Sequence, residues 1–344
     1  MRPEPLLTLL QSVNNQTLYP NEILIVDGSL NNATKTMLDA NKFANLQYFL
    51  MTDDQRGLTK QRNFGILRSA SDIEIICFLD DDTILEISYF EELLKTYQIH
   101  PEALGACGYI TNEASWEKVA PDYHFKNDEF FYDGWKRKDS SRFRLRKKLK
   151  LDSTLAPGFP PDFAHGRSVN FLPPSGKLYE VQQLMGGVSS FRKRIFDTFS
   201  VSHYFEGYGL YEDADFTLRV SKIGKLYVNT NARVGHYHNQ SGRPNKFNYG
   251  KMVVRNGWYV WRVKDPDPSF TARMKWHVIT ILLMAIRFSN IFTTSKRMEA
   301  LTEALGRKVG WLSLLFNKPT IREPHFAAPF SYDQCHQSFF SANN

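Results

Sequence analysis

An apolar run that ends in three consecutive acids constrains the fold more than any other feature of this 344-residue sequence. Residues 73–79 (IEIICFL) are followed at once by Asp80, Asp81 and Asp82. Such a run predicts a buried strand of a parallel sheet, whose carboxyl edge is where open α/β sheets bind their ligands. Carboxylates at that edge suit a divalent cation that holds phosphate. An N-cap for the helix expected over 87–98 would explain Asp82 alone, but three acids exceed what a cap needs.

Strand patterns alternate with helix patterns over the first 110 residues. Apolar residues recur at helical spacing over 6–13 and 58–70, and short apolar runs predict strands over 22–26, 46–50 and 104–110. This alternation predicts an α/β fold with a mostly parallel sheet flanked by helices.

The pattern loosens over residues 112–180, where polar, aromatic and basic residues surround proline-rich turns. A segment this long without regular structure is typical of an insertion or of an acceptor-side lid. We therefore predict one domain over 1–240 that contains this segment, and a helical extension over 241–344.

Basic residues gather between positions 136 and 150, with nine Lys and Arg against the single acid Asp139. We expect a surface feature, which is either a solvated face or a site for anionic lipid head groups. Nucleic acid is not an expected partner, because the chain shows no zinc-finger pattern, RNA-binding aromatic motif or helix-turn-helix.

A second membrane signal is the apolar run over 276–286, flanked by Lys275 and Arg287. It is shorter than the roughly 20 residues that span a bilayer, so a core helix and an interfacial helix both stay open. Three cysteines without a CxxC pair, and an N-terminus without a visible signal peptide, favour reduced thiols. We expect a cytoplasmic protein that is peripheral on the inner membrane face.

Four separated segments form a recognisable order: Asp27 after a strand, GLTKQRN over 57–63, Asp80–Asp82, and YEDADF over 211–216. Over roughly residues 5–240 the chain resembles an inverting glycosyltransferase of the GT-A fold, family 2. Each segment alone is weak evidence, and their joint order carries the resemblance.

The resemblance assigns the donor nucleotide to the first strands. It implies that Asp27 accepts a hydrogen bond from the imide nitrogen of the base, with a turn-forming role as the alternative. Arg62 would meet the diphosphate or the base, with a plain surface arginine as the alternative, and Asn63 would fix the loop.

The same resemblance matches Asp80 and Asp82 to the outer members of the DxD motif. It places Asp80 near the ribose, counts Asp81 with the donor site, and assigns Asp82 to the Mn²⁺ or Mg²⁺ that bridges the diphosphate. The ion would act as a Lewis acid toward the leaving group.

Asp213 matches the family's general base, which takes the proton of the acceptor hydroxyl. Glu212 would orient it or contact the acceptor. The alternative is that both acids only complement a helix N-terminus.

Gly186 and Gly187 match a turn beside the donor sugar, where absent side chains let the backbone approach. His236 and His238 are candidate ligands of the metal or the diphosphate, without a choice between them, and Arg243 is a possible diphosphate contact. For each glycine and histidine, a purely local role is the alternative.

The implied reaction is transfer of a sugar from a nucleotide-sugar donor to a glycan or polyprenyl-linked acceptor, in cell-surface polysaccharide synthesis. A nucleotidyltransferase is a rival, although we find no glycine-rich basic phosphate loop after the first strand. A catalytically silent glycan-binding or scaffold protein of the same fold is the other rival.

The resemblance departs from the family pattern at Arg2-Pro3-Glu4, which in family members follows a central strand that touches the nucleotide. We expect a chain that lacks this first strand to bind nucleotide weakly, because its neighbours lose backbone partners.

Overall fold

The computed structural model describes residues 2–238, 244–322 and 337–338, and the chain divides into two compact units. Unit 1 comprises Met1–Glu113, Pro174–Gln240 and Glu323–Asn344, and unit 2 comprises Ala114–Pro173 and Ser241–Arg322. Most of the segment that the sequence suggested as an insertion is thus grouped with the C-terminal helices. Arg243 and Cys335 lie outside the described residues, and Cys77 and Cys107 are free thiols.

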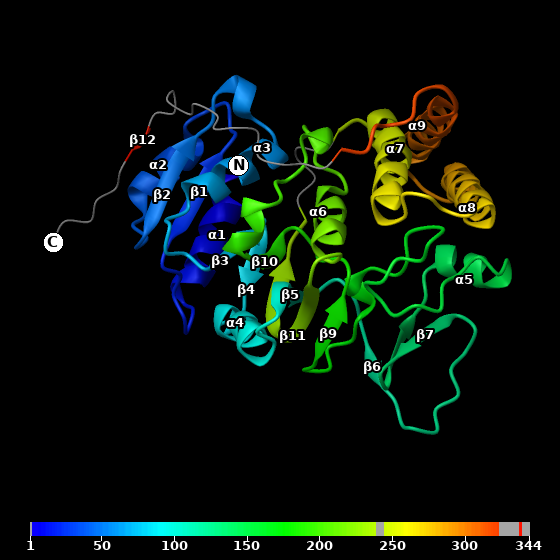
Figure 1. Cartoon of the computed structure of the whole chain (residues 1–344), viewed down its shortest axis with the longest axis horizontal. Coiled ribbons are helices and arrows are strands. Elements are labelled where there is room, and N and C mark those ends of the chain that lie inside the picture. The colour runs from blue at the N-terminus through cyan, green and yellow to red at the C-terminus, as the bar shows by residue number, and fades with distance from the viewer. Residues whose placement is uncertain (1, 239–243, 323–336, 339–344) are drawn as a thin grey trace. The chain divides into compact units, whose positions relative to one another are not determined.

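Unit 1 follows the predicted alternation of strands and helices (Figure 1). Its helices and strands are α1 (Pro3–Asn14), β1 (Ile23–Asp27), α2 (Ala33–Ala40), β2 (Leu46–Leu50), α3 (Leu58–Arg68), β3 (Ile75–Leu79), β4 (Thr83–Leu85), α4 (Tyr89–Ile99), β5 (Ala103–Ile110), β9 (Leu178–Val181), β10 (Val188–Arg192), α6 (Glu212–Val220), β11 (Lys225–His236) and β12 (Gln337–Ser338).

The strands of unit 1 form two sheets in the described residues. One has the order β1-β2-β12, and the other has the order β3-β10-β5-β11-β4 with β9 paired to β11. The pairs β1–β2 and β5–β11 are parallel, whereas all other pairs in these two sheets are antiparallel. The mixed α/β class is confirmed, but the expected mostly parallel pairing is wrong because β10 runs against both of its neighbours.

Strand β3 also differs from its prediction as a buried parallel strand. It pairs antiparallel with β10 at an end of the sheet, and each of its residues is half-buried. Its apolar residues still serve the core, since Ile75, Cys77 and Leu79 pack against it.

The main core of unit 1 lies where helices α1 and α4 meet the strands. Leu6, Leu9, Leu10 and Val13 of α1 recur at helical spacing and are buried in this cluster. Helix α3 packs on β1, where Phe64 joins a smaller buried group. Helices α1 and α4 thus pack on the sheet whose edge carries the acids, and α3 packs on the sheet that contains β1.

Unit 2 contains an antiparallel three-stranded sheet and a group of helices. Its helices and strands are β6 (Glu117–Lys118), β7 (Glu129–Tyr132), β8 (Trp135–Lys138), α5 (Ser141–Lys148), α7 (Lys246–Lys264), α8 (Phe270–Ser289) and α9 (Arg297–Phe316). Helix α9 contacts both α7 and α8, and Trp261 stacks on Trp276 with ring centroids 5.3 Å apart. Strands β6, β7 and β8 lie in the segment before α5, which is therefore more regular in structure than its sequence pattern predicted.

Two surface predictions for unit 2 need correction. Within the basic run Arg146 is fully buried, and its guanidinium donates to the carbonyl oxygens of Leu151 and His165. The apolar run is part of a longer stretch, Phe270–Phe292, whose 23 residues are enough to span a bilayer by length and whose most apolar 18-residue window has a mean hydropathy of 1.2. Only 11% of its most apolar window is buried, which speaks against a core helix.

Candidate active site

The sheet of unit 1 brings several chemically active side chains to one edge. Strands β5 and β11 are parallel, and β3 runs in the same direction because both β3 and β5 pair antiparallel with β10. The ends of these three strands deliver Asp80–Asp82, Glu113 and His236. Strand β10 begins at the same edge and is preceded by Gly186 and Gly187.

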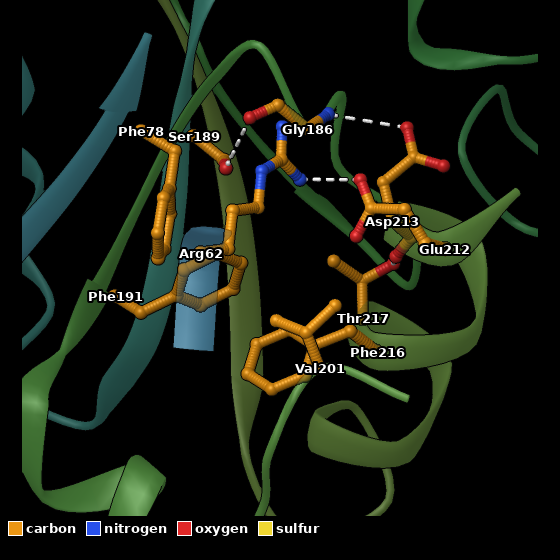
Figure 2. Close-up of a pocket in the computed structure, with 10 residues that line it drawn as sticks. All are labelled: Arg62, Phe78, Gly186, Ser189, Phe191, Val201, Glu212, Asp213, Phe216 and Thr217. Atoms are coloured by element: carbon orange, nitrogen blue, oxygen red, sulfur yellow. Dashed lines mark hydrogen bonds and ion pairs between the residues drawn. The ribbon is translucent and has the colours of Figure 1, made fainter. Parts of the chain in front are cut away.

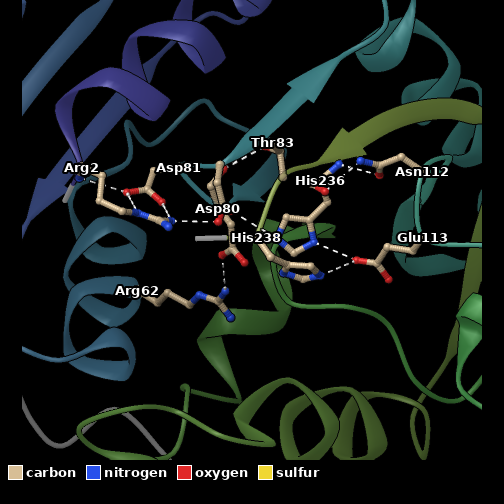
Figure 3. A network of polar contacts seen from close by, with 10 residues as sticks. Arg2, Arg62, Asp80, Asp81, Thr83, Asn112, Glu113, His236 and His238 are labelled. Atoms are coloured by element: carbon tan, nitrogen blue, oxygen red, sulfur yellow. Dashed lines mark hydrogen bonds and ion pairs between the residues drawn. The ribbon is translucent and has the colours of Figure 1, made fainter. Parts of the chain in front are cut away.

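Asp80, Asp82 and His236 form a group that fits a divalent cation. One ligand atom from each residue lies within 4.8 Å of the others, and His236 Nε2 is 3.2 Å from Asp82 Oδ1. Figure 3 shows Asp80 and His236 of this group. Two carboxylates and one imidazole are a donor set that Mn²⁺ accepts. These three residues, which the sequence reasoning named, would hold the ion.

Glu113 is a site residue that the sequence reasoning missed. Its Oε1 lies 3.1 Å from His236 Nδ1 and 2.9 Å from His238 Nε2. Hydrogen bonds to Asp82 and Glu113 raise the pKa of His236 to about 9, so the ion-free imidazole donates on both sides. A cation would replace the Nε2 proton while Glu113 still holds Nδ1. Glu113 follows the strand predicted over 104–110 by three residues. The expectation that acids just after a strand belong to the site, which selected Asp80, would also have selected Glu113.

Asp81 is engaged by Arg2, a contact that the sequence did not predict. The Arg2 guanidinium forms an ion pair with Asp81, and the Arg2 backbone N–H donates to Asp81 Oδ2 at 3.2 Å. The same guanidinium lies 3.0 Å from Asp82 Oδ2. Arg2 thereby steadies the acidic triplet, and donor binding by Asp81 stays a prediction.

Arg62 connects the acidic triplet to helix α6. Its guanidinium forms an ion pair with Glu212, lies 3.7 Å from Asp80 Oδ1, and stands over the ring of Phe78 at 5.4 Å (Figure 2). Burial raises the pKa of Glu212 to about 8, although Arg62 opposes this shift. The observed partners of Arg62 are thus acids of the site.

Asp213 is held by backbone amides at the start of α6. Its Oδ2 accepts a hydrogen bond from the Gly186 amide at 3.1 Å, and its Oδ1 accepts one from the Ala214 amide at 2.8 Å. The next residue, Gly187, accepts a hydrogen bond from the Asp80 amide at 2.9 Å. The glycine turn therefore ties Asp213 to Asp80, beside a small pocket that Arg62 and Glu212 also line (Figure 2).

Asp27 and Asn63 make contacts that are typical of local structure. Asp27 is buried and accepts hydrogen bonds from the Ser29 amide at 2.9 Å and the Tyr48 hydroxyl at 3.0 Å. Burial alone would raise the pKa of Asp27, but hydrogen bonds from Ser29 lower it below its ordinary value. Asn63 exchanges two hydrogen bonds with the backbone of Val201, which fixes a loop. The role of Asp27 toward a base stays a prediction.

The first 161 residues match the sequence profile described as "Glycosyl transferase family 2". This match covers 161 of the 344 residues of the chain. The match supports the family that the ordered motifs predicted and, in general terms, glycosyltransferase activity.

A curated relative in this comparison is the glucosyl-dolichyl phosphate glucuronosyltransferase of Haloferax volcanii. It is 27% identical over 124 residues, which span only 35% of this chain and 35% of that protein. Among solved structures, the mannosyltransferase PcManGT from Pyrobaculum calidifontis, in complex with GDP-Man and Mn²⁺, is 9% identical with a TM-score of 0.47. That match covers 92% of this chain and 85% of PcManGT. GalNAc-T7 with UDP, GalNAc and Mn²⁺ is 15% identical with a TM-score of 0.46, covering 73% of this chain and 46% of GalNAc-T7.

Proposed function

We propose that this protein is a metal-dependent inverting glycosyltransferase that moves a sugar from a nucleotide donor to a glycan or polyprenyl-linked acceptor. One observation carries the proposal: the cation-competent group of Asp80, Asp82 and His236 is tied to Asp213 through the glycine turn. A leaving-group site and a base are thus parts of one edge of unit 1.

On the donor side, Asp80, Asp82 and His236 would hold Mn²⁺ or Mg²⁺. When bound, such an ion neutralises charge on the departing diphosphate as a Lewis acid. Arg62 keeps Asp80 in place from the other side and adds positive charge near the diphosphate. The glycine turn lets the donor sugar approach backbone rather than side chains.

On the acceptor side, we assign Asp213 as the general base. The acceptor oxygen forms a bond to the anomeric carbon while the bond from that carbon to the diphosphate oxygen breaks. The hydroxyl proton passes to a carboxylate oxygen of Asp213, whose position the Gly186 and Ala214 amides fix. Glu212 and Arg62 hold the start of α6 and so keep the base aligned.

For the acceptor, we propose a lipid-phosphate-linked sugar, used in assembly of a cell-surface polysaccharide. The name of the Haloferax relative supports this class, since that protein acts on a glucosyl-dolichyl phosphate. A lipid-linked acceptor is anchored in a bilayer, so we place the enzyme in the cytoplasm at the surface of a membrane. The long exposed apolar stretch Phe270–Phe292 supports this location.

Donor binding and donor hydrolysis test the proposal. A panel of sugar nucleotides, including glucuronate donors, is screened by thermal shift with and without Mn²⁺, and release of nucleoside diphosphate is then measured. We expect one donor to stabilise the protein only with metal, and Asp82→Ala to abolish both effects. Asp72→Asn, an exposed acid away from the site, is the matched control. Release of pyrophosphate, or no response to any donor, would refute the proposed reaction.

A further inference from the structure

Helix α8 presents a stripe of exposed apolar side chains. Residues 270, 274, 278, 281 and 288 recur at α-helical spacing and so lie on one face of α8, and residue 292 follows in the short 3-10 turn Asn290–Phe292. Phe270 is 78% exposed and Phe292 is 77% exposed. The other exposed members are Met274, Val278, Ile281 and Phe288. A row of this length is more than the scattered apolar residues found on any protein surface.

The opposite face of α8 is seated in unit 2. Ala272, Trp276 and Ile279 are buried, Trp276 stacks on Trp261, and Trp311 donates to His277 at 3.1 Å. A helix that spans a bilayer by itself needs an apolar surface all round, whereas a helix that lies in the interface needs one apolar face. The one-sided packing of α8 therefore favours an interfacial position.

Helix α9 adds a second stripe of the same kind. Its exposed apolar residues Met298, Leu305, Val309, Leu312 and Phe316 also share one face, and Phe316 is 91% exposed. Helices α8 and α9 contact each other, so both stripes belong to one helical pair. We call these two stripes the apolar face.

The charge of unit 2 indicates what this face meets. Unit 2 contains 27 Lys and Arg against 12 Asp and Glu, a net charge of +15, whereas the remainder of the chain carries a net charge of −8. The stretch Phe270–Phe292 contains no acid. Lys296, just before α9, Arg297 and Lys308 in α9, and Lys318, just after it, are exposed. Clustered cations beside an apolar face are complementary to anionic lipid.

We propose that the apolar face of α8 and α9 docks unit 2 onto an anionic lipid bilayer. The two helices lie in the plane of the interface, with their apolar stripes in the acyl region and the flanking Lys and Arg on lipid phosphates. The inference rests on the proposed membrane-surface location and names the surface that provides it, but it does not depend on the sugar-transfer chemistry.

Vesicle flotation of the full chain tests the docking. Vesicles of phosphatidylcholine mixed with phosphatidylglycerol are compared with pure phosphatidylcholine vesicles, at low and high salt. We expect the protein to float with the anionic vesicles, less so at high salt, and to be released by alkaline carbonate. The triple variant Ile281→Ser/Phe288→Ser/Phe292→Ser should lower the partition coefficient between vesicle and water about tenfold or more. The reason is that three apolar side chains no longer enter the acyl region of the lipid.

A matched variant separates the apolar face from apolar exposure in general. Leu30→Ser/Ile99→Ser/Ile223→Ser changes three exposed apolar residues of unit 1 and should float like the unaltered protein. Circular dichroism and thermal unfolding check that both triple variants are folded.

Four results would overturn the docking. They are absence of flotation with anionic vesicles, equal loss in both triple variants, resistance to carbonate extraction, which indicates a spanning helix, and a dimer in light scattering that the α8 variant dissociates. Donor binding measured by thermal shift on the same proteins keeps the two proposals apart. Intact donor binding without flotation refutes the docking alone, and flotation without donor binding refutes the proposed reaction alone.

Discussion

Gly187→Ala is the sharpest test of the acidic edge, because the added methyl group enters the space of Asp80. A Cβ at position 187 would lie 2.9 Å from Asp80 Oδ1 and closer still to Oδ2 and Cγ. Ordinary contacts of a Cβ begin at 3.4 Å, so even the farther oxygen must retreat by about 0.5 Å. A metal site tolerates deviations of about ±0.2 Å in its ligand distances. The Asp80 carboxylate must therefore leave the position that it shares with Asp82 and His236.

We expect Gly187→Ala to weaken Mn²⁺ binding about 10- to 100-fold, the loss seen when metal ligands are misoriented. Electron paramagnetic resonance titration of free Mn²⁺, with and without donor, measures this directly. Gly65→Ala is the control, because a Cβ there makes only an ordinary contact at 3.5 Å with Val26 and the helix gains up to ~1 kcal/mol. Mn²⁺ affinity unchanged in a folded Gly187→Ala protein would refute the assignment of Asp80 to the ion.

Four further predictions address the base, the histidine, the pH response and the helices of unit 2. Asp213→Asn should lower kcat about 10²- to 10⁴-fold with donor affinity unchanged, in steady-state transfer or hydrolysis assays. Glu113→Ala should weaken Mn²⁺ binding about 10- to 100-fold in the same titration, and Glu113→Gln should weaken it less because an acceptor for His236 remains. Burial raises the pKa of Asp215 to about 6. Between about pH 4 and pH 6, the Asp215 carboxyl is therefore protonated in the folded state and ionised in the unfolded state. Stability in urea should fall as pH rises through that window, by at most ~3 kcal/mol, and Asp215→Asn should remove that part of the slope. Gly306→Ala should destabilise unit 2 by about 1 to 3 kcal/mol in thermal unfolding, since its Cβ would press on the backbone of Phe247 across the α7–α9 contact.

Each of these predictions has a result that contradicts it. A proportional loss of donor affinity in Asp213→Asn would indicate a binding role, and equal effects of Ala and Gln at position 113 would remove the orienting role of Glu113. An Asp215→Asn protein with the same pH slope as the parent would mean that other groups produce it. A Gly306→Ala protein with an unchanged melting temperature would show that the helix contact has room for a methyl group.

Much of unit 1 could be predicted because its signals are local. The apolar spacing of Leu6 to Val13 gave the first helix, and the strand predicted over 46–50 has the bounds of β2. Pairing direction could not be predicted in this way, since the antiparallel insertion of β10 between β3 and β5 depends on contacts distant in sequence. For the same reason, the burial of Arg146 inside a run of cations was not foreseeable.

The sequence by itself predicted the chemistry of the acidic triplet and the family that residues 1–161 match, because ordered motifs on strand ends are short-range features. Only the tertiary structure decided which partners the acids have. It joined Asp81 to Arg2, set Asp82 against His236, and tied Asp80 to Asp213 through one glycine turn. These contacts join segments up to about 150 residues apart, as in the Arg62–Glu212 pair, and only the folded sheet brings such segments to one edge.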